Sequence, residues 1–134
     1  MRIAIIGILA SVFTFTSCAQ SESTSTQGET TTVESTTEVK RVSKAEFKAF
    51  LAENTDVQLI DVRTPGEFQS GAIDGASNID YNDPSFEANI NNLDKNAPVL
   101  IYCRSGNRSA KALKVFEANG FTHVLELEGG YLNW

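Results

Sequence analysis

The residue types and spacing best suited to chemistry lie in one short segment, Cys103, Arg104, Ser105, Gly106, Asn107 and Arg108. This segment joins an apolar run, typical of a buried strand, to a predicted helix. A loop that enters a helix directs several backbone N–H groups inward, and they form a cradle for an anion. Gly106 permits the tight path, and the two arginines add positive charge. We therefore expect the pKa of the Cys103 thiol to fall below its free value of about 8.5, which gives a thiolate nucleophile without a histidine base.

The alternative is that Cys103 is a structural cysteine at the end of a strand, since buried cysteines are common. The flanking arginines, the glycine and the strand-to-helix turn favour catalysis. A disulfide with Cys18 is disfavoured because it would tie an N-terminal apolar segment to a distant loop. The sequence has no Cys-x-x-Cys pair, so it indicates neither a zinc site nor a thioredoxin-like redox pair, and we expect no metal and no cofactor.

Strands and helices alternate over residues 42–134. Apolar runs predict strands at 57–60, 76–79, 98–102 and 123–127, and the run at 98–102 is typical of a strand buried on both faces. This alternation predicts an α/β fold of three layers, with a central, mostly parallel sheet of about five strands and helices on both faces. Sites in such sheets gather beyond the carboxyl ends of the strands, which is where Cys103 lies.

Three predicted helices have recognisable ends. Ser43 and Glu46 form a capping box. Asp83-Pro84 predicts a helix that continues to about Leu93. The helix after the cysteine loop runs from about Arg108 to Asn119, with Gly120 as its stop.

The last strand carries three polar residues to which we assign no chemistry. His123 opens the strand and is expected to be structural. Glu126 and Glu128 alternate along it and are expected to face solvent.

Four segments resemble, in order, the signatures of the rhodanese family: 59–68 (LIDVRTPGEF), 71–79 (GAIDGASNI), 99–109 (VLIYCRSGNRS) and 120–134 with its LEGGY and final Trp134. Two departures are present. The family usually has His-Ile-Pro where this chain has Ala72-Ile73-Asp74, which bears on loop orientation. Relatives also usually continue past the position of Trp134, so the last helix is expected to be a stub.

The resemblance implies a single-domain sulfurtransferase. Cys103 would take the outer sulfur of a donor such as thiosulfate as a persulfide and pass it to a thiol or cyanide, which predicts ping-pong kinetics. The amides of residues 104–108 would cradle the persulfide, and Arg104 and Arg108 are candidates for donor binding and loop bracing. Asp61 and Arg63 are expected to brace the fold near the site.

Two other functions remain open. A phosphatase also grips its anion with a cysteine loop, but its C-x5-R spacing is one residue longer than the spacing from Cys103 to Arg108, and position 109 is serine. The shorter loop from Cys103 to Arg108 suits a sulfur atom better than a phosphoryl group. The second alternative is a sulfur-sensing or protein-docking module that keeps the fold without turnover.

Residues 1–18 predict an export signal. They open with Arg2, are almost purely apolar from 3 to 15, and end at Ser17-Cys18. The apolar stretch matches the core of a secretory signal and is short for a bilayer span. Its end resembles a bacterial lipobox, which implies lipidation of Cys18 and an exported, membrane-anchored lipoprotein, periplasmic or at the cell surface. An uncleaved anchor or ordinary cleavage near Cys18 are the alternatives.

Residues 19–41 are dominated by Ser, Thr, Gln and Glu, and predict a disordered tether between the signal and the domain at 42–134. The formal net charge of −6, without a dense Lys/Arg stripe, argues against a nucleic-acid partner. The expected partners are a small sulfur-containing anion, a thiol acceptor and, through the lipid, a membrane. We expect a monomer.

Overall fold

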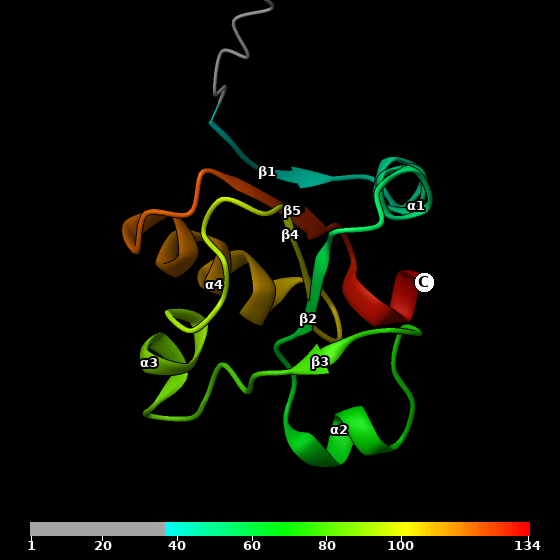
Figure 1. Ribbon diagram of the computed structural model, residues 1–134. Helices are drawn as coiled ribbons and strands as arrows, with labels where there is room; N and C mark the ends of the chain where they lie inside the picture. Colours follow the sequence, from blue (N-terminus) through cyan, green and yellow to red (C-terminus); the bar gives the residue numbers. More distant parts are fainter. Residues whose placement is uncertain (1–36) are drawn as a thin grey trace, which may run out of the picture. The chain divides into compact units, whose positions relative to one another are not determined.

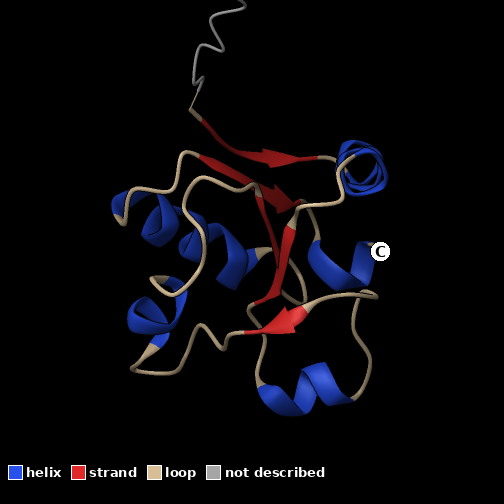
Figure 2. Cartoon of the chain, in the orientation of Figure 1, coloured by secondary structure: helices blue, strands red, loops and turns tan. Residues whose placement is uncertain are grey.

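The computed structural model of the protein describes residues 37–134 (Figures 1 and 2). In chain order the elements are β1 Glu38–Val42, α1 Lys44–Glu53, β2 Gln58–Asp61, α2 Pro65–Gln69, β3 Ser77–Asn78, α3 Phe86–Ile90, β4 Val99–Tyr102, α4 Asn107–Ala118, β5 His123–Leu127 and a final 3-10 turn, η1, Gly130–Asn133. The predicted signal at 1–18, with Cys18, and the predicted tether as far as residue 36 lie outside the described residues.

The five strands form one sheet in the order β1-β5-β4-β2-β3, and every neighbouring pair is parallel. Helices α3 and α4 cover one face, and α1 and the C-terminal turn cover the other (Figure 1). The predicted α/β fold with helices on both faces is therefore confirmed. Because the strands are parallel, their carboxyl ends meet at one edge of the sheet, and the β4–α4 loop with Cys103 leaves from that edge.

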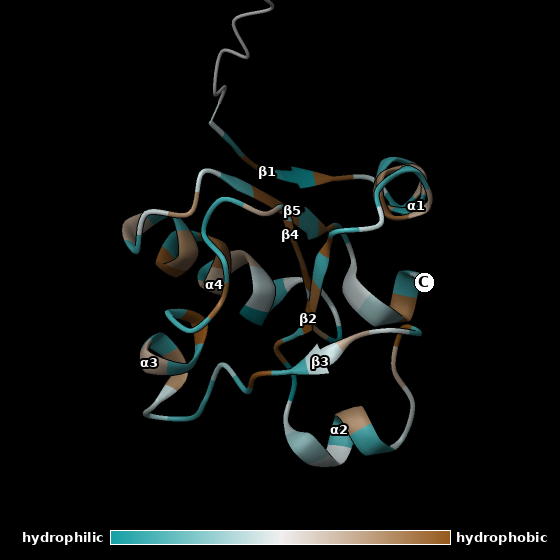
Figure 3. Ribbon diagram, viewed as in Figure 1, coloured by the Kyte–Doolittle hydropathy of each residue, from teal (hydrophilic) through white to brown (hydrophobic). Residues whose placement is uncertain are grey.

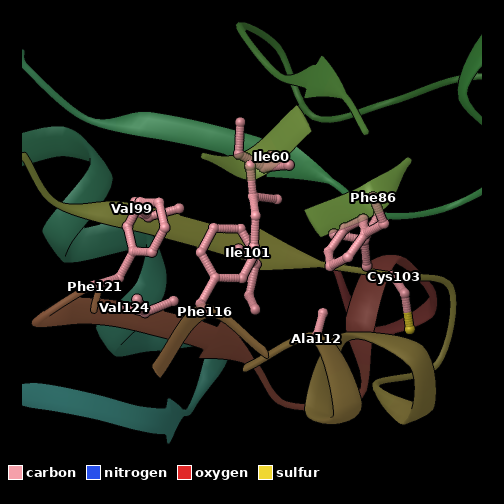
Figure 4. Close-up of a cluster of buried hydrophobic side chains, with 11 residues drawn as sticks. Ile60, Phe86, Val99, Ile101, Cys103, Ala112, Phe116, Phe121 and Val124 are labelled. Carbon is pink, nitrogen blue, oxygen red and sulfur yellow. The ribbon is translucent and has the colours of Figure 1, made fainter. Parts of the chain in front are cut away.

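Strand β4 supplies both hydrophobic cores because successive side chains of a strand point to opposite faces. Val99, Ile101 and Cys103 belong to the cluster beneath α3 and α4. Leu100 and Tyr102 belong to the cluster beneath α1. All four residues of β4 are buried, as predicted for 98–102, and the strand runs brown through the middle of the sheet in Figure 3. Figure 4 shows Cys103 at one end of the first cluster, away from Val99 and Phe121.

The caps predicted for two helices are confirmed. The Ser43 side chain accepts from the Glu46 N–H while the Glu46 side chain accepts from the Ser43 N–H. Gly120 has φ +84 and follows the last turn of α4, as expected of a helix stop. Thr64 and Glu67 form a second capping box, with Pro65 in the first turn, and this starts helix α2. That helix was not predicted, although Thr64-Pro65-Gly66-Glu67 carries the same signal as Ser43 to Glu46.

Two predicted boundaries are wrong. The domain begins at β1 with Glu38 and not at Val42, because residues 38–41 pair in parallel with β5 and are therefore not part of a tether. The helix predicted from Asp83-Pro84 begins only at Phe86 and ends at Ile90. The Asp83 carboxylate accepts from the Ser85 N–H at 2.7 Å in the turn before the helix, so it caps a turn and not the helix.

Candidate active site

The loop between β4 and α4 wraps around the sulfur of Cys103. The Gly106 N–H donates to the Cys103 Sγ at 3.1 Å, and the Ser109 Oγ lies 3.4 Å from the same sulfur. Gly106 has φ +87, the left-handed conformation that glycine adopts at little cost, and this turn directs its N–H at the sulfur. The predicted cradle of inward-facing amides is thus present at Gly106, and Ser109 adds a hydroxyl that was not predicted.

Opposing effects act on the pKa of the Cys103 thiol. Burial raises this pKa, since the residue is only 1 % exposed and a charged sulfur loses its water there. The Ser109 hydroxyl and N–H and the N–H groups of Ser105 and Gly106 lower it. The donors prevail, and the pKa lies below its ordinary value, in the direction that the sequence predicts.

The outer side of the loop is held by the C-terminal turn. The Tyr131 N–H donates to the Cys103 carbonyl at 2.8 Å, and the Leu132 N–H donates to the Arg104 carbonyl at 2.9 Å. Gly130, with φ +60, lies so close that a Cβ there would overlap the Cys103 carbonyl oxygen and the Arg104 backbone. These bonds turn the loop carbonyls outward and leave the amides free to face the sulfur.

Arg108 braces the loop against helix α2. Its two terminal nitrogens donate to the two carboxylate oxygens of Glu67, each at 2.7 Å. The Arg108 guanidinium lowers the pKa of the Glu67 carboxyl to about 2, the direction expected when a positive charge favours the ionised form. Of the two roles predicted for Arg108, these contacts supply loop bracing, and the partner Glu67 was not predicted.

Arg104, Ser105 and Asn107 have exposed side chains on the loop. Within residues 37–134, the Arg104 side chain makes no hydrogen bond and no ion pair, so donor binding by Arg104 stays a prediction. In the same part of the chain, no three His, Cys, Asp or Glu side chains are grouped as a metal site requires.

Asp61 and Arg63 form a buried pair at the end of β2. The Arg63 side chain donates to Asp61 Oδ2 at 2.6 Å and to the Gly71 carbonyl at 2.6 Å, and its guanidinium lies 4.4 Å from the centre of the Tyr131 ring. The exposed fractions are 0 % for Asp61 and 4 % for Arg63. The pair connects β2, the segment before β3 and the C-terminal turn, an arrangement that suits the bracing predicted for it.

The expectation that Glu126 faces solvent is wrong, because its side chain is completely buried. The Ser109 hydroxyl contacts Glu126 Oε1 at 2.5 Å, and Arg41 Nε donates to Glu126 Oε2 at 2.5 Å. Arg41 also donates to the Gly106 carbonyl at 3.0 Å. Strand β5 lies between β1 and β4 with α4 packed on it, so alternation along its sequence does not place one set of side chains in water. Glu128, beyond the end of β5, is exposed as expected.

One sequence signal could have predicted that Glu126 is buried with a partner: it is a carboxylate inside a mostly apolar strand. A buried carboxylate requires a partner. Arg41 on β1 is this partner. Its position beside Glu126 can be predicted only once residues 38–42 are recognised as a strand that pairs with β5.

Known proteins resemble this chain over the described domain. The rhodanese-like domain family matches residues 43–134. YqhL of Bacillus subtilis is 38 % identical over 72 % of this chain and 72 % of its own length. A sulfurtransferase of Allochromatium vinosum is 33 % identical, over 72 % of this chain and 88 % of its own. The thiosulfate sulfurtransferase GlpE of Pseudomonas entomophila is 35 % identical over 72 % of this chain and 85 % of its own length.

Solved structures share the fold. A rhodanese-like domain protein from Staphylococcus aureus superposes with a TM-score of 0.63 at 37 % identity, covering 71 % of this chain and 90 % of that chain. A human single-domain sulfurtransferase superposes with a TM-score of 0.59 at 26 % identity, covering 70 % of this chain and 93 % of that chain. The match over 43–134 and these relatives show that the chain belongs to the rhodanese-like domain family.

Proposed function

We propose that this protein is a sulfurtransferase in which Cys103 carries the transferred sulfur. The Cys103 thiolate attacks the outer sulfur of a donor such as thiosulfate, a sulfur–sulfur bond forms to Sγ, and sulfite leaves with the electron pair of the bond that breaks. The resulting persulfide anion then gives its outer sulfur to cyanide or a thiolate, and the Cys103 thiolate returns. Two covalent half-steps of this kind give ping-pong kinetics.

The observation that carries the proposal is the bond from the Gly106 N–H to the Cys103 sulfur at 3.1 Å. It belongs to a cradle that faces a sulfur anion, and the pKa of the Cys103 thiol is lowered accordingly. The sulfurtransferases among the relatives support sulfur transfer as the general activity. Thiosulfate as donor is supported by the similarity to GlpE, a thiosulfate sulfurtransferase, and by the charge of the loop.

The burial of Cys103 favours sulfur over phosphoryl transfer. Its sulfur lies within the short loop between β4 and α4, and the residue is 1 % exposed. A terminal sulfur atom is a narrow group that can approach such a nucleophile end-on. A tetrahedral phosphoryl group is wider, and it needs several donors around its three oxygens.

The direct test is the intact mass of the protein. Incubation with thiosulfate should add one sulfur to the wild type, and later addition of cyanide should remove it with formation of thiocyanate. Cys103→Ser should gain no sulfur. Thr122→Ala, which removes an exposed hydroxyl between α4 and β5 and outside the active-site loop, is the control and should load like the wild type.

Two outcomes would overturn the proposal. A wild-type protein that gains no sulfur from thiosulfate or from polysulfide would be a sensing or docking module. Hydrolysis of an aryl phosphate that depends on Cys103 would instead indicate a phosphatase.

We further propose that the protein is exported and anchored through a lipid on Cys18. The support is the apolar stretch from 3 to 15 followed by Ser17-Cys18. One chain gives only marginal membrane binding, and two or more give stable anchoring, because each buried methylene adds about 0.8 kcal/mol. Within residues 37–134 no helix is long and apolar enough to span a membrane.

Expression in a bacterium and mass analysis of the mature N-terminus test this anchor. The expected product begins at an acylated Cys18 and fractionates with membranes, and Cys18→Ser should lose the acyl mass. A mature wild-type protein without acyl chains at this position would refute the anchor and leave the Cys103 chemistry untouched.

A further inference from the structure

Ser109 is shared between the Cys103 sulfur and a buried carboxylate. Its Oγ is 3.4 Å from the Cys103 Sγ and 2.5 Å from Glu126 Oε1. Ser109 and Glu126 are 0 % exposed and Cys103 is 1 % exposed, so the three groups form a buried row. A hydroxyl has one proton and two lone pairs, so Ser109 can donate to only one of these neighbours at a time.

This arrangement allows two fully hydrogen-bonded states. In the first, the Cys103 thiol donates to Ser109, and Ser109 donates to an ionised Glu126. In the second, a protonated Glu126 donates to Ser109, and Ser109 donates to the Cys103 thiolate. The states differ by a one-step shift of two protons, with a net transfer of one proton from sulfur to carboxylate. No bond other than O–H and S–H changes, and the total charge is constant.

We propose that Cys103, Ser109 and Glu126 form a proton relay, in which Glu126 takes up the thiol proton through Ser109 as the thiolate forms. Glu126 is thus a positioning residue that acts on the nucleophile through Ser109. This assignment rests on the proposed role of Cys103 in sulfur transfer.

The first ground for the relay is burial, because Cys103 is 1 % exposed and the Ser109 oxygen, 3.4 Å from its sulfur, is placed to accept the thiol proton. The second is electrostatic. A thiolate beside an ionised Glu126 would place two negative charges within a short distance in a buried site, and their repulsion opposes the presence of both charges at once. Moving the proton along the row keeps a single negative charge in the site.

The charged groups around the row set the balance between the two states. Arg41 on β1 donates to Glu126 and places a positive charge beside it. The N–H groups of the β4–α4 loop favour the thiolate. Arg108 on α4 and Glu128 after β5 act at longer range, Arg108 on Cys103 and Glu128 on Arg41.

The test follows the alkylation of Cys103 by iodoacetamide as a function of pH. It uses the full chain in detergent, and mass spectrometry of the peptide that contains Cys103 keeps the signal separate from Cys18. The variants are Glu126→Gln, Ser109→Ala and the double variant. Glu128→Gln is the matched control, because Glu128 is exposed on the same segment of the chain.

In the wild type and in Glu128→Gln, the alkylation rate should rise with pH in two steps, as a coupled pair requires. Glu126→Gln removes the competing negative charge, and its amide can still donate to Ser109. Its rate should therefore rise in one step, with a midpoint lower by about one pH unit. Ser109→Ala keeps the pair of Glu126 with Arg41, so the buried carboxylate retains its positively charged partner. It should also show one step, with a midpoint above that of Glu126→Gln.

Three results would overturn the relay. The first is a Glu126→Gln profile that superimposes on the wild type or moves to higher pH. The second is a two-step profile in Ser109→Ala. The third is that Glu126→Gln shifts the midpoint by the same amount in the Ser109→Ala variant as in the wild type. The carboxylate would then act on the sulfur by its electric field alone and not through Ser109. Alkylation does not need sulfur transfer, so a failure to load thiosulfate sulfur would reject the proposed function separately from the relay.

Discussion

The Arg108 guanidinium binds both carboxylate oxygens of Glu67 at 2.7 Å and so ties the active-site loop to a helix 41 residues earlier in the chain. Glu67 also accepts from the Thr64 N–H, which starts that helix. One carboxylate therefore serves as helix cap and loop brace together. This connection makes the stability of the loop depend on the ionisation of a single group.

Acid should remove the contribution of Glu67. Its pKa falls from an ordinary 4.5 to about 2 in the folded protein, so the stabilisation is complete above pH 4.5 and is lost as pH falls toward about 2. Glu67→Gln should lower the free energy of unfolding by about 1 kcal/mol at pH 7, because the pair is partly solvated. Urea unfolding at several pH values should show this difference shrinking between pH 4.5 and about 2. A difference that is independent of pH would refute this linkage, and the exposed Glu117→Gln serves as control.

Gly130→Ala should disturb the loop strongly. The added Cβ would overlap the backbone of Cys103 and Arg104, and φ is +60. Backbone atoms cannot move aside as a flexible side chain can, so we expect a loss of more than about 2 kcal/mol and slower sulfur loading. Gly75→Ala is the matched control, because it has φ +84 with open space around the position. It should cost only about 1 kcal/mol and load normally, as measured by thermal unfolding and intact mass. Equal effects of the two variants would contradict the close packing of Gly130 on the loop.

Asp61→Ala should destabilise the fold without a specific effect on the chemistry. It leaves the Arg63 guanidinium buried without its carboxylate, which costs about 3–5 kcal/mol. Urea unfolding measures the loss, and sulfur loading per folded molecule should stay near the wild-type level. Asp74→Ala, at an exposed carboxylate, is expected to change stability by less than about 0.5 kcal/mol. A stable Asp61→Ala variant with little sulfur loading would instead place Asp61 in the reaction.

Removal of β1 should lower the free energy of unfolding, because it leaves the buried Glu126 without Arg41. A chain of residues 37–134 keeps the strand and the pair between Arg41 and Glu126, whereas a chain of 43–134 loses both. We expect the shorter chain to be less stable by about 3 kcal/mol, because one partner of an ion pair stays buried alone. Adding Glu126→Gln to the shorter chain should recover part of that loss. Equal unfolding midpoints for the two lengths would show that β1 contributes little.

Local signals predicted the elements whose determinants lie within a few residues of one another. The capping box of Ser43 and Glu46, the buried run at 99–102 and the strand at 123–127 are each complete in a short window of sequence. The cysteine loop belongs to this group, because a strand, a glycine with positive φ and a helix start follow one another directly. Its lowered Cys103 pKa follows mostly from that local geometry.

The features that could not be predicted depend on segments that are distant in the chain. The sequence of β1, EVKRV, has no strong strand pattern, and it becomes a strand because β5 offers it a free edge. Glu126 alternates like a solvent-facing residue, yet it is buried because β1, β4 and α4 surround β5. Arg108 carries a charge whose use depends on Glu67 arriving from another helix. The chain thus encodes the nucleophile and its loop in one stretch of residues, while the partners that hold the loop come from three-dimensional packing, since ion pairs and strand pairing act across space and leave no short-range pattern.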